Sequence, residues 1–427
     1  MNRLALLFVS LLALGSCTFF NSNREVAAVV DTIVVVENKE KPVDIGRKDF
    51  PIYDKLSGIK NKLSEIADSI EFCALAPDPL LDGTFVADVA LTDSDVFVIW
   101  RIDAIYRFDR AGRFKNKIGS LGQGPEEYAQ LGDNLMVDEE QRTVTVVDAG
   151  QIRIKTYDYD GKLLKSVPIP NRYATSLIKM DAGTYIVRTV DSERYRPNCP
   201  ALRLMDVSGK LIKTYKSHLY PITKDKEKGW HYGPMQNSLW EYNGHFYTLE
   251  YGNDTIYRVD KNQLVADRTL SGTNYRPSMY NLFHSGSGDK RLLLPMMMRP
   301  NSDIFESDRF VLFRCFEESK RYFMVYDKTD GQVYQSLHED APVRERTGEK
   351  LSAYFTDDLV SGMPFTPEYR SGEKIIGWLS APEIVENREK ILQFAETCTS
   401  AEAARFREIV TRMKEDDNPV LMIVKLK

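Results

Sequence analysis

The sequence predicts an all-β fold, a β-propeller with six blades of four antiparallel strands each. Three observations predict it. Short runs of strand-forming residues continue almost to the end of the chain, and a turn motif recurs between them at nearly constant spacing. The chain is also rich in aromatic residues, with 22 Tyr and 20 Phe among 427 residues, and these favour strands. A repeat of roughly 40–50 residues that holds four strands is the spacing of a propeller blade.

The repeated turn consists of an apolar residue, an Asp, two spacers and a Gly. It occurs at 108–112, 157–161 and 205–209, has one extra spacer at 326–331, and keeps only its Asp at 259–262. Successive Asp residues are 49, 48, 54 and 67 positions apart. An Asp side chain can cap a turn and Gly tolerates positive φ, so each copy predicts a tight hairpin between two strands.

Four strands, A to D, are expected in each of the first five blades. By blade, they are 85–91, 96–100, 104–109 and 114–118; 134–137, 143–148, 153–158 and 163–169; 176–180, 185–189, 201–206 and 211–216; 238–242, 245–251, 254–260 and 264–270; and 303–307, 310–316, 321–327 and 333–337.

The sixth blade is expected to carry a helical insertion, because Leu, Phe and Ile recur every three or four residues in a charged stretch near the C-terminus. In order, its parts are two strands, the helical stretch and a last strand, at 364–369, 374–380, 381–414 and 419–426. The ring must close, because an open strand edge would aggregate. Residues 69–75 or 32–36 would supply the missing strand, and we favour 69–75.

The charge balance argues against a nucleic-acid-binding protein. The chain has 57 basic and 62 acidic residues and a net charge of −5. A nucleic-acid footprint needs basic residues clustered on one face, and no such excess exists here. We therefore expect no nucleic-acid partner.

The N-terminus has the features of an export signal with a lipid-attachment site. A positive start is followed by the short apolar run Leu4–Leu14, which is too short to span a bilayer, and then by Leu14-Gly15-Ser16-Cys17. We interpret this as a lipobox in which Cys17 receives the lipid; an ordinary secretory signal with a chance Cys is the alternative. The predicted organisation is a signal peptide at 1–17, a tether with an N-terminal strand at 18–54, and the propeller at 55–427.

Several segments carry a resemblance to a known family. Residues 118–128, Ile-Gly-Ser-Leu-Gly-Gln-Gly-Pro-Glu-Glu-Tyr, resemble a loop of the six-bladed β-propeller lipoproteins of Gram-negative anaerobes, which are related in fold to NHL-repeat and TolB-like propellers. Residues 253–258 and 418–423 and the lipobox are similar to that family as well, whereas Glu126 stands where the family usually has Gly. The resemblance covers about residues 55–427. It implies the fold and an envelope location, with the outer membrane contacted only through a lipid anchor, and it implies no particular activity.

The candidate binding site is the rim of the propeller that holds the long loops. The D-to-A and B-to-C connections share one rim, and most D-to-A connections here are long, at 119–133, 217–237, 271–302 and 339–363. Long loops on one rim tend to carry function. The candidates lie at the ends of the B strands and in two of these loops: Arg101, Tyr128, Asp148, Arg188, Trp230, His231, Tyr232, Glu250, Arg314 and Trp378. Alternatively, the charged residues pair with one another across the funnel, and the aromatic residues pack within their own loop.

The sequence favours binding over catalysis, although an enzyme stays open. The five His residues show no metal-binding spacing, and no catalytic motif such as GxSxG occurs, so we predict neither a metal nor a cofactor. The first hypothesis is an envelope-anchored binding module or scaffold for a glycan, a peptide or a protein. The alternatives are a lactonase-like hydrolase or lyase with a metal in the central funnel, and an architectural subunit of an uptake complex.

Overall fold

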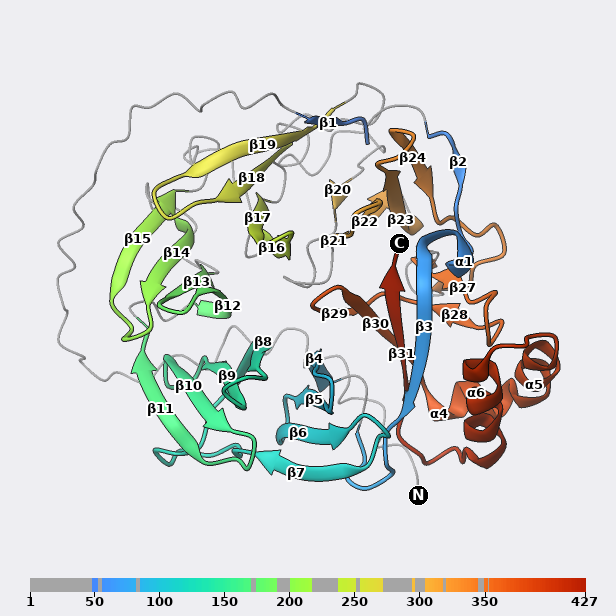
Figure 1. Ribbon diagram of the computed structural model, residues 1–427, viewed down its shortest axis with the longest axis horizontal. Coiled ribbons are helices and arrows are strands. Elements are labelled where there is room, and N and C mark those ends of the chain that lie inside the picture. The colour runs from blue at the N-terminus through green and yellow to red at the C-terminus, as the bar shows by residue number, and fades with distance from the viewer. Residues whose placement is uncertain are drawn as a thin grey trace, which may run out of the picture. The chain divides into compact units, whose positions relative to one another are not determined.

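Six antiparallel sheets of four core strands are arranged as a six-bladed β-propeller, which confirms the predicted fold class (Figure 1). The computed structural model describes residues 48–52, 56–81, 85–169, 174–189, 200–216, 237–250, 254–271, 294–295, 304–317, 320–344, 349–351 and 353–427. Strand A of each blade lies innermost and strand D outermost.

The first three blades follow the expected strand order. Their strands A to D are β4 Val86–Leu91, β5 Asp95–Trp100, β6 Ala104–Asp109 and β7 Phe114–Ile118 in blade I; β8 Leu131–Asp138, β9 Thr143–Asp148, β10 Arg153–Asp158 and β11 Leu163–Pro168 in blade II; and β12 Ala174–Asp181, β13 Thr184–Thr189, β14 Pro200–Asp206 and β15 Leu211–Lys216 in blade III.

The last three blades contain the same four positions. Their strands A to D are β16 Asn237–Tyr242, β17 His245–Glu250, β18 Thr255–Val259 and β19 Leu264–Leu270 in blade IV; β21 Ile304–Glu306, β22 Phe310–Glu317, β23 Lys320–Asp327 and β24 Gln332–Gln335 in blade V; and β29 Tyr369–Ser371, β30 Lys374–Leu379, β31 Val420–Leu426 and β3 Ala67–Ala74 in blade VI.

The repeated Asp and Gly residues form the C-to-D hairpins as predicted. Asp109 accepts hydrogen bonds from the backbone N–H groups two and four residues later, at 2.9 and 3.0 Å, and Asp158 repeats both bonds at 3.0 and 2.8 Å. The closing glycines Gly112 and Gly161 have φ of 83° and 91°, which is the left-handed region. The recurring motif is therefore a local signal for one turn geometry.

The ring closes through a strand from the N-terminal part of the chain. β3 pairs antiparallel with β31, so that Phe72 lies opposite Met422 and Ala74 opposite Val420. This confirms residues 69–75 as the preferred closing strand. Apolar residues of blade VI, including Cys73 and Leu421, then pack against Val96 and Phe108 of blade I.

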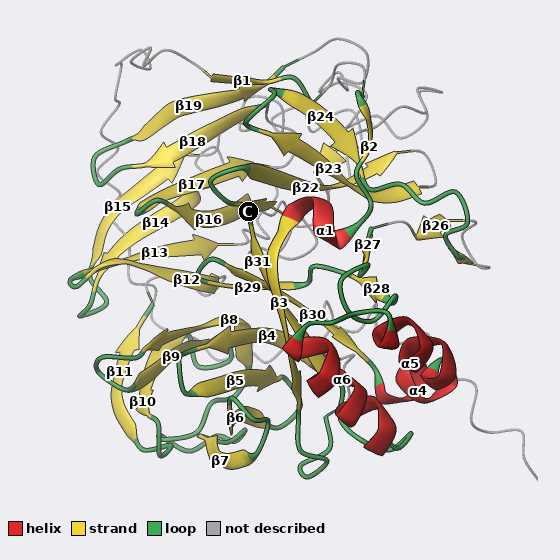
Figure 2. Cartoon of the chain, turned by 45° about the vertical axis from the view of Figure 1, so that its right-hand side comes forward, coloured by secondary structure: helices red, strands yellow, loops and turns green. Residues whose placement is uncertain are grey.

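The helical insertion lies between strands B and C of blade VI, also as predicted. It consists of α4 Ala381–Glu386, α5 Arg388–Glu396 and α6 Ala401–Arg412, which gather beside that blade (Figure 2). Ser380 caps α4, with its hydroxyl accepting from the backbone N–H of Glu383. Phe406 stacks on Phe72 of β3 with 4.0 Å between ring centroids, which attaches the insertion to the closing strand.

The N-terminal segment also covers two outer edges, a feature that the sequence analysis did not predict. β1 Lys48–Phe50 adds a parallel strand to β19 of blade IV, and β2 Gly58–Ile59 adds one to β24 of blade V. The one-turn helix α1 Leu63–Ile66 then leads into β3. These two strands are too short to show a period of two in the sequence.

One expected strand of blade VI belongs elsewhere. Residues 364–369 were expected as its strand A, but β28 Pro364–Phe365 pairs with β27 Phe355–Thr356 in a separate two-stranded sheet, and β29 supplies strand A. Pro364 at the start of the run has no backbone N–H to donate, which suits a short edge strand and not the interior of a blade. The other short strands are β20 Leu294–Pro295, β25 Val343–Arg344 and β26 Glu349–Leu351, which join the sheet of blade V.

Candidate functional site

A cavity of about 1260 Å³ lies at the centre of the propeller, and all six blades contribute to its wall. Its deep part is lined by inner strands, for example at Asp88 and Leu177, and its mouth by A-to-B turns, for example at Gly244, Asp308 and Gly372. The A-to-B turns lie on the rim opposite to the D-to-A and B-to-C connections. The cavity therefore opens away from the rim that the sequence analysis favoured.

The wall of the cavity is rich in carboxylates. Nine lining residues are acidic and five are basic. The acidic ones are Asp68, Asp88, Asp138, Glu139, Glu140, Glu241, Glu306, Asp308 and Glu373, and the basic ones are Lys165, Lys179, Arg370, Lys425 and Lys427. This surplus favours a ligand that carries positive charge.

Much of this surplus of acidic residues comes from the A-to-B turns of the blades. Every blade has an acidic residue within or beside its A-to-B turn: Asp93, Glu139, Asp181, Glu241, Asp308 and Glu373. Of these, Glu139, Glu241, Asp308 and Glu373 line the cavity. Sequence reasoning missed this ring because single acidic residues in short turns are typical of any solvated surface. Counting acidic residues by blade position, after the strands had been assigned, would have revealed it.

Some of these carboxylates are neutralised by neighbours. Asp138 pairs with Lys179 at 2.7 Å, and Glu373 pairs with Lys425 at 3.4 Å. Glu140 and Glu241 have exposed side chains, and no ion pair is described for either. These two acids at the mouth are therefore available to a ligand.

Glu306 is a buried junction between blades IV and V. It accepts hydrogen bonds from the Trp240 indole at 2.9 Å and from Lys328 at 2.9 Å, and it also pairs with Arg268. Burial acts to raise the pKa of Glu306, but the charges of Arg268 and Lys328 outweigh it and lower the pKa. Glu306 therefore stays ionised and holds the wall of the cavity in place.

Arg370, on the inner strand β29, is one of the basic residues that blade VI contributes to the cavity wall. Its Nε donates to the carbonyl of Gly372 at 2.9 Å. Burial lowers the pKa of Arg370, while Glu306, Glu241 and Glu373 act to raise it. The guanidinium thus offsets part of the negative charge around it.

Polar side chains tie neighbouring inner strands together. Asn134 on β8 donates to the carbonyl of Leu177 on β12 at 2.8 Å and accepts from the N–H of the same residue at 3.1 Å. Asp88 on β4 accepts from the N–H of Leu135 on β8 at 3.0 Å. These bonds fix the registers of blades I to III around the cavity.

On the opposite rim, the structure brings two of the predicted residues together. Arg101 of blade I and Arg188 of blade III both approach Asp133 of blade II, at 2.6 and 3.4 Å. Arg188 is fully buried, whereas the Arg101 side chain is half exposed. Asp133, which the sequence analysis did not select, therefore links three blades.

Two other predicted residues hold the loop that follows β7: Tyr128 lies in this loop, and Asp148 at the end of β9 contacts it. The hydroxyl of Tyr128 is buried, donates to the carbonyl of Ile118 at 3.0 Å and accepts from the N–H of Ile105 at 3.1 Å. Asp148 is buried, pairs with Lys155 at 3.2 Å and accepts from backbone N–H groups at the end of the loop. The loop that carried the family resemblance is thus packed tightly between blades I and II.

The remaining predicted residues are dispersed. Glu250 is buried at the end of β17, and Arg314 of β22 donates to the carbonyl of Pro367. Trp378 of β30 contacts Tyr369 edge-on, with 5.8 Å between ring centroids. Trp230, His231, Tyr232 and Cys17 lie outside the described residues, so their roles stay predictions.

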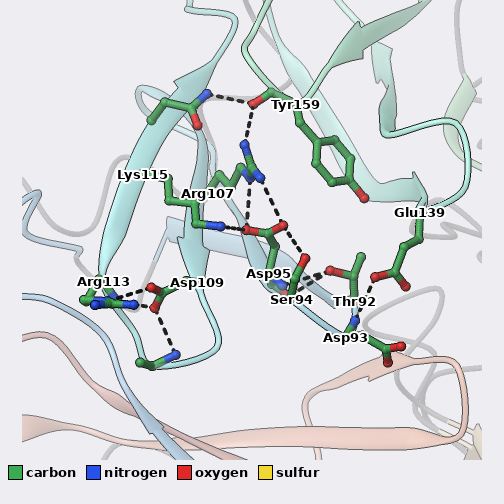
Figure 3. A network of polar contacts seen from close by, with 12 residues as sticks. Thr92, Asp93, Ser94, Asp95, Arg107, Asp109, Arg113, Lys115, Glu139 and Tyr159 are labelled. Atoms are coloured by element: carbon green, nitrogen blue, oxygen red, sulfur yellow. Dashed lines mark hydrogen bonds and ion pairs between the residues drawn. The ribbon is translucent and has the colours of Figure 1, made fainter.

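A second charged network lies in blade I, around the buried Asp95 (Figure 3). Arg107 donates to it from Nε and Nη2, each at 3.1 Å, and Lys115 donates at 2.6 Å. Ser94 adds a hydrogen bond at 2.7 Å. Burial acts to raise the pKa of Asp95, but these hydrogen bonds outweigh it and lower the pKa to about 2. Because its donors saturate the carboxylate, the network is structural.

The described part of the chain shows no metal centre and no membrane-spanning helix. Within those ranges, no three His, Cys, Asp or Glu side chains converge as ligands for a metal ion. None of the helices found there is both long and apolar enough to cross a bilayer.

Comparisons with known proteins give the fold and the family. A Bacteroides fragilis protein, provisionally assigned as exported, superposes with a TM-score of 0.60 at 17% identity, covering 87% of this chain and 100% of that one. Virginiamycin B lyase from Staphylococcus aureus gives 0.43 at 11% identity (84% and 100% covered), and a DUF4221 member from Bacteroides vulgatus gives 0.42 at 12% (84% and 97%). No curated protein matches the sequence. The model of a domain of unknown function, DUF4934, matches residues 47–425, and the chain therefore belongs to the DUF4934 family.

Proposed function

We propose that this protein is a non-enzymatic binding propeller whose central cavity takes a basic peptide segment of a partner protein. The observation that carries the proposal is the cavity itself, with all six blades in its wall and nine acidic against five basic lining residues. Carboxylates at the mouth would pair with Lys or Arg side chains of the segment.

The size of the cavity supports a chain segment over a small metabolite. Sites for drug-sized molecules usually enclose about 300–1,000 Å³, and this cavity has about 1260 Å³. Its wall also offers hydroxyl and amide groups, including Thr143, Gln141 and Asn243, which suit the polar backbone of a peptide.

The location is part of the proposal. The apolar run before Cys17 supports export and a lipid anchor. The similar fold of the Bacteroides fragilis protein, which is provisionally assigned as exported, agrees with export. We place the anchor at Cys17 and the propeller at the cell envelope, on the outer membrane. Glycan or protein binding at the loop-rich rim stays a separate prediction, because several of those loops lie outside the described residues.

The test measures binding of a fluorescently labelled peptide of lysine and alanine to the full-length chain by anisotropy. The double variant Glu140→Gln/Glu241→Gln removes two exposed acids at the mouth. Each exposed ion pair contributes about 0.2–1 kcal/mol, so we expect the affinity to fall by roughly twofold to thirtyfold and the effect to shrink as salt rises.

The matched control is Glu386→Gln/Glu389→Gln, which makes the same charge change on the helical insertion. Its affinity should equal that of the wild type. Equal loss in both double variants, or equally tight binding of a glutamate–alanine peptide, would refute recognition by the mouth.

A further inference from the structure

The outermost strands of the blades differ in whether a further strand pairs with them. Blades IV and V each carry an added parallel strand on their outer edge, β1 on β19 and β2 on β24. Among the described residues, no strand pairs with the outer edge of β7 in blade I, β11 in blade II, β15 in blade III or β3 in blade VI. An unpaired outer strand presents free backbone donors and acceptors to other chains.

Two of these bare strands, β11 and β15, share a sequence pattern. Residues 162–167 read Lys-Leu-Leu-Lys-Ser-Val, and residues 210–215 read Lys-Leu-Ile-Lys-Thr-Tyr. Neither stretch contains an Asp or a Glu. The corresponding stretch of blade IV, where the edge is covered, reads Gln-Leu-Val-Ala-Asp-Arg at 263–268 and lacks both lysines. The pattern sets β11 and β15 apart both from this covered edge and from the bare edge of β7, where residues 113–118 read Arg-Phe-Lys-Asn-Lys-Ile.

The second lysine of each pattern has a structural role. Lys165 donates from Nζ to the carbonyl of Val207 in the next blade at 2.5 Å, and Lys213 makes the equivalent bond to the carbonyl of Asn262. The first lysines, Lys162 and Lys210, are exposed. These first lysines remain available to a partner.

Exposed apolar side chains are concentrated on the same two strands. Of seven exposed large apolar residues among those described, Leu164, Leu211 and Ile212 lie here, and Leu164 and Ile212 are 52% and 53% exposed. Charged residues alone would suffice to protect an edge from aggregation. Exposed Leu and Ile beside a free strand edge are instead typical of a contact surface.

We infer that the edges of β11 and β15 are docking sites for an extended, acidic segment of a partner protein, which adds a strand as β1 and β2 do. Backbone hydrogen bonds supply affinity in this mode, and alternate side chains supply specificity. Lys162 and Leu164 are both exposed at the start of β11, as are Lys210 and Ile212 at the start of β15. A segment that alternates acidic and apolar side chains on each face complements them. This surface goes beyond the proposed function, since it takes an acidic segment and the cavity takes a basic one.

The test uses a labelled peptide built from repeated Glu-Glu-Val-Val, which alternates acidic and apolar residues on both faces. Anisotropy with the full-length chain should show saturable binding. The double variant Leu164→Lys/Ile212→Lys should weaken it by at least about tenfold. The control Leu80→Lys changes a residue that is 57% exposed outside this surface, and it should leave the affinity unchanged.

Three further measurements make the outcome decisive. A peptide N-methylated at alternate residues should bind at least about tenfold more weakly, because strand addition needs its N–H groups. Equal binding of that peptide, or of a Lys-Lys-Val-Val peptide, would overturn the inference, as would the absence of any binding by the acidic one. Sedimentation of the wild type checks for a second copy as occupant: a dimer that Leu164→Lys/Ile212→Lys dissociates would overturn the partner assignment. Unchanged circular dichroism and melting temperature must accompany each variant.

Discussion

Replacing Asp95 by Asn should destabilise the propeller strongly at neutral pH. The Asp95 carboxylate is fully buried and pairs with Arg107, whose side chain is only 8% exposed, and with Lys115 (Figure 3). Removing the negative charge leaves the buried guanidinium with only the exposed Asp160, at 3.9 Å, as a counter-ion. Breaking a buried pair from one side costs about 3–5 kcal/mol, and because Asn keeps one acceptor oxygen we expect the lower end, about 3 kcal/mol.

The lowered pKa of Asp95 gives the size and the direction of the pH dependence of folding stability. Folding lowers that pKa from its ordinary 3.8 to about 2, so the ionised carboxylate stabilises the folded state at pH values above about 4. This contribution, about 2 kcal/mol, is lost as the pH falls from 4 to 2. Wild type and Asp95→Asn should therefore differ most at pH 7 and approach each other in acid.

The assay is thermal unfolding followed by circular dichroism at pH 7 and at pH 3. For a domain of this size we expect Asp95→Asn to lower the melting temperature by about 3–6 °C at pH 7, with a smaller difference at pH 3. Asp93→Asn, an exposed neighbour in the same turn, is the control and should behave as wild type. The reasoning fails if the two variants melt alike at pH 7, or if the gap between Asp95→Asn and wild type is the same at both pH values.

Three more expectations follow from single contacts. In urea unfolding, Gly112→Ala should destabilise the protein far more than Gly331→Ala. Both glycines have positive φ, but only at Gly112 would the new Cβ lie 1.8 Å from a backbone carbonyl oxygen of β3. Equal losses of unfolding free energy in the two variants would contradict this. Tyr128→Phe should cost about 1–3 kcal/mol in the same assay, because two buried backbone groups lose their partner; a neutral effect would show that water replaces the hydroxyl. Burial raises the pKa of Cys73 to about 11. After iodoacetamide treatment at pH 8, mass spectrometry of the folded protein should therefore find Cys73 unmodified and the partly exposed Cys398 alkylated. Prompt alkylation of Cys73 would contradict this.

The fold was largely predictable because its signals are local and repeated. The Asp and Gly of each C-to-D turn act within five residues, as the hydrogen bonds of Asp109 and the positive φ of Gly112 show. The helical insertion showed its own periodicity, and the need to close the ring left two candidate strands, of which the preferred one, residues 69–75, is confirmed. By contrast, β1 and β2 are held by pairing with distant strands, and sequences of two or three residues carry no period.

The site was less predictable because it depends on which faces meet. Arg101 and Arg188 were selected from their strand positions, but Asp133, which they share, lies in an irregular stretch of β8. The cavity mouth was missed for a similar reason. Its acids, such as Glu140 and Glu241, are scattered along the sequence and become neighbours only when the blades form a ring.

The closing strand has a consequence for how the protein is made. Ala67 of β3 pairs with Leu426 of β31, so a contact between residues near opposite ends of the sequence completes blade VI. Contacts of such long sequence separation form slowly and carry a loop-closure entropy. Early blades can assemble while later ones are still being synthesised, but β3 must wait, unpaired, for the last strand. Until then its edge is exposed to chaperones, proteases and other nascent chains.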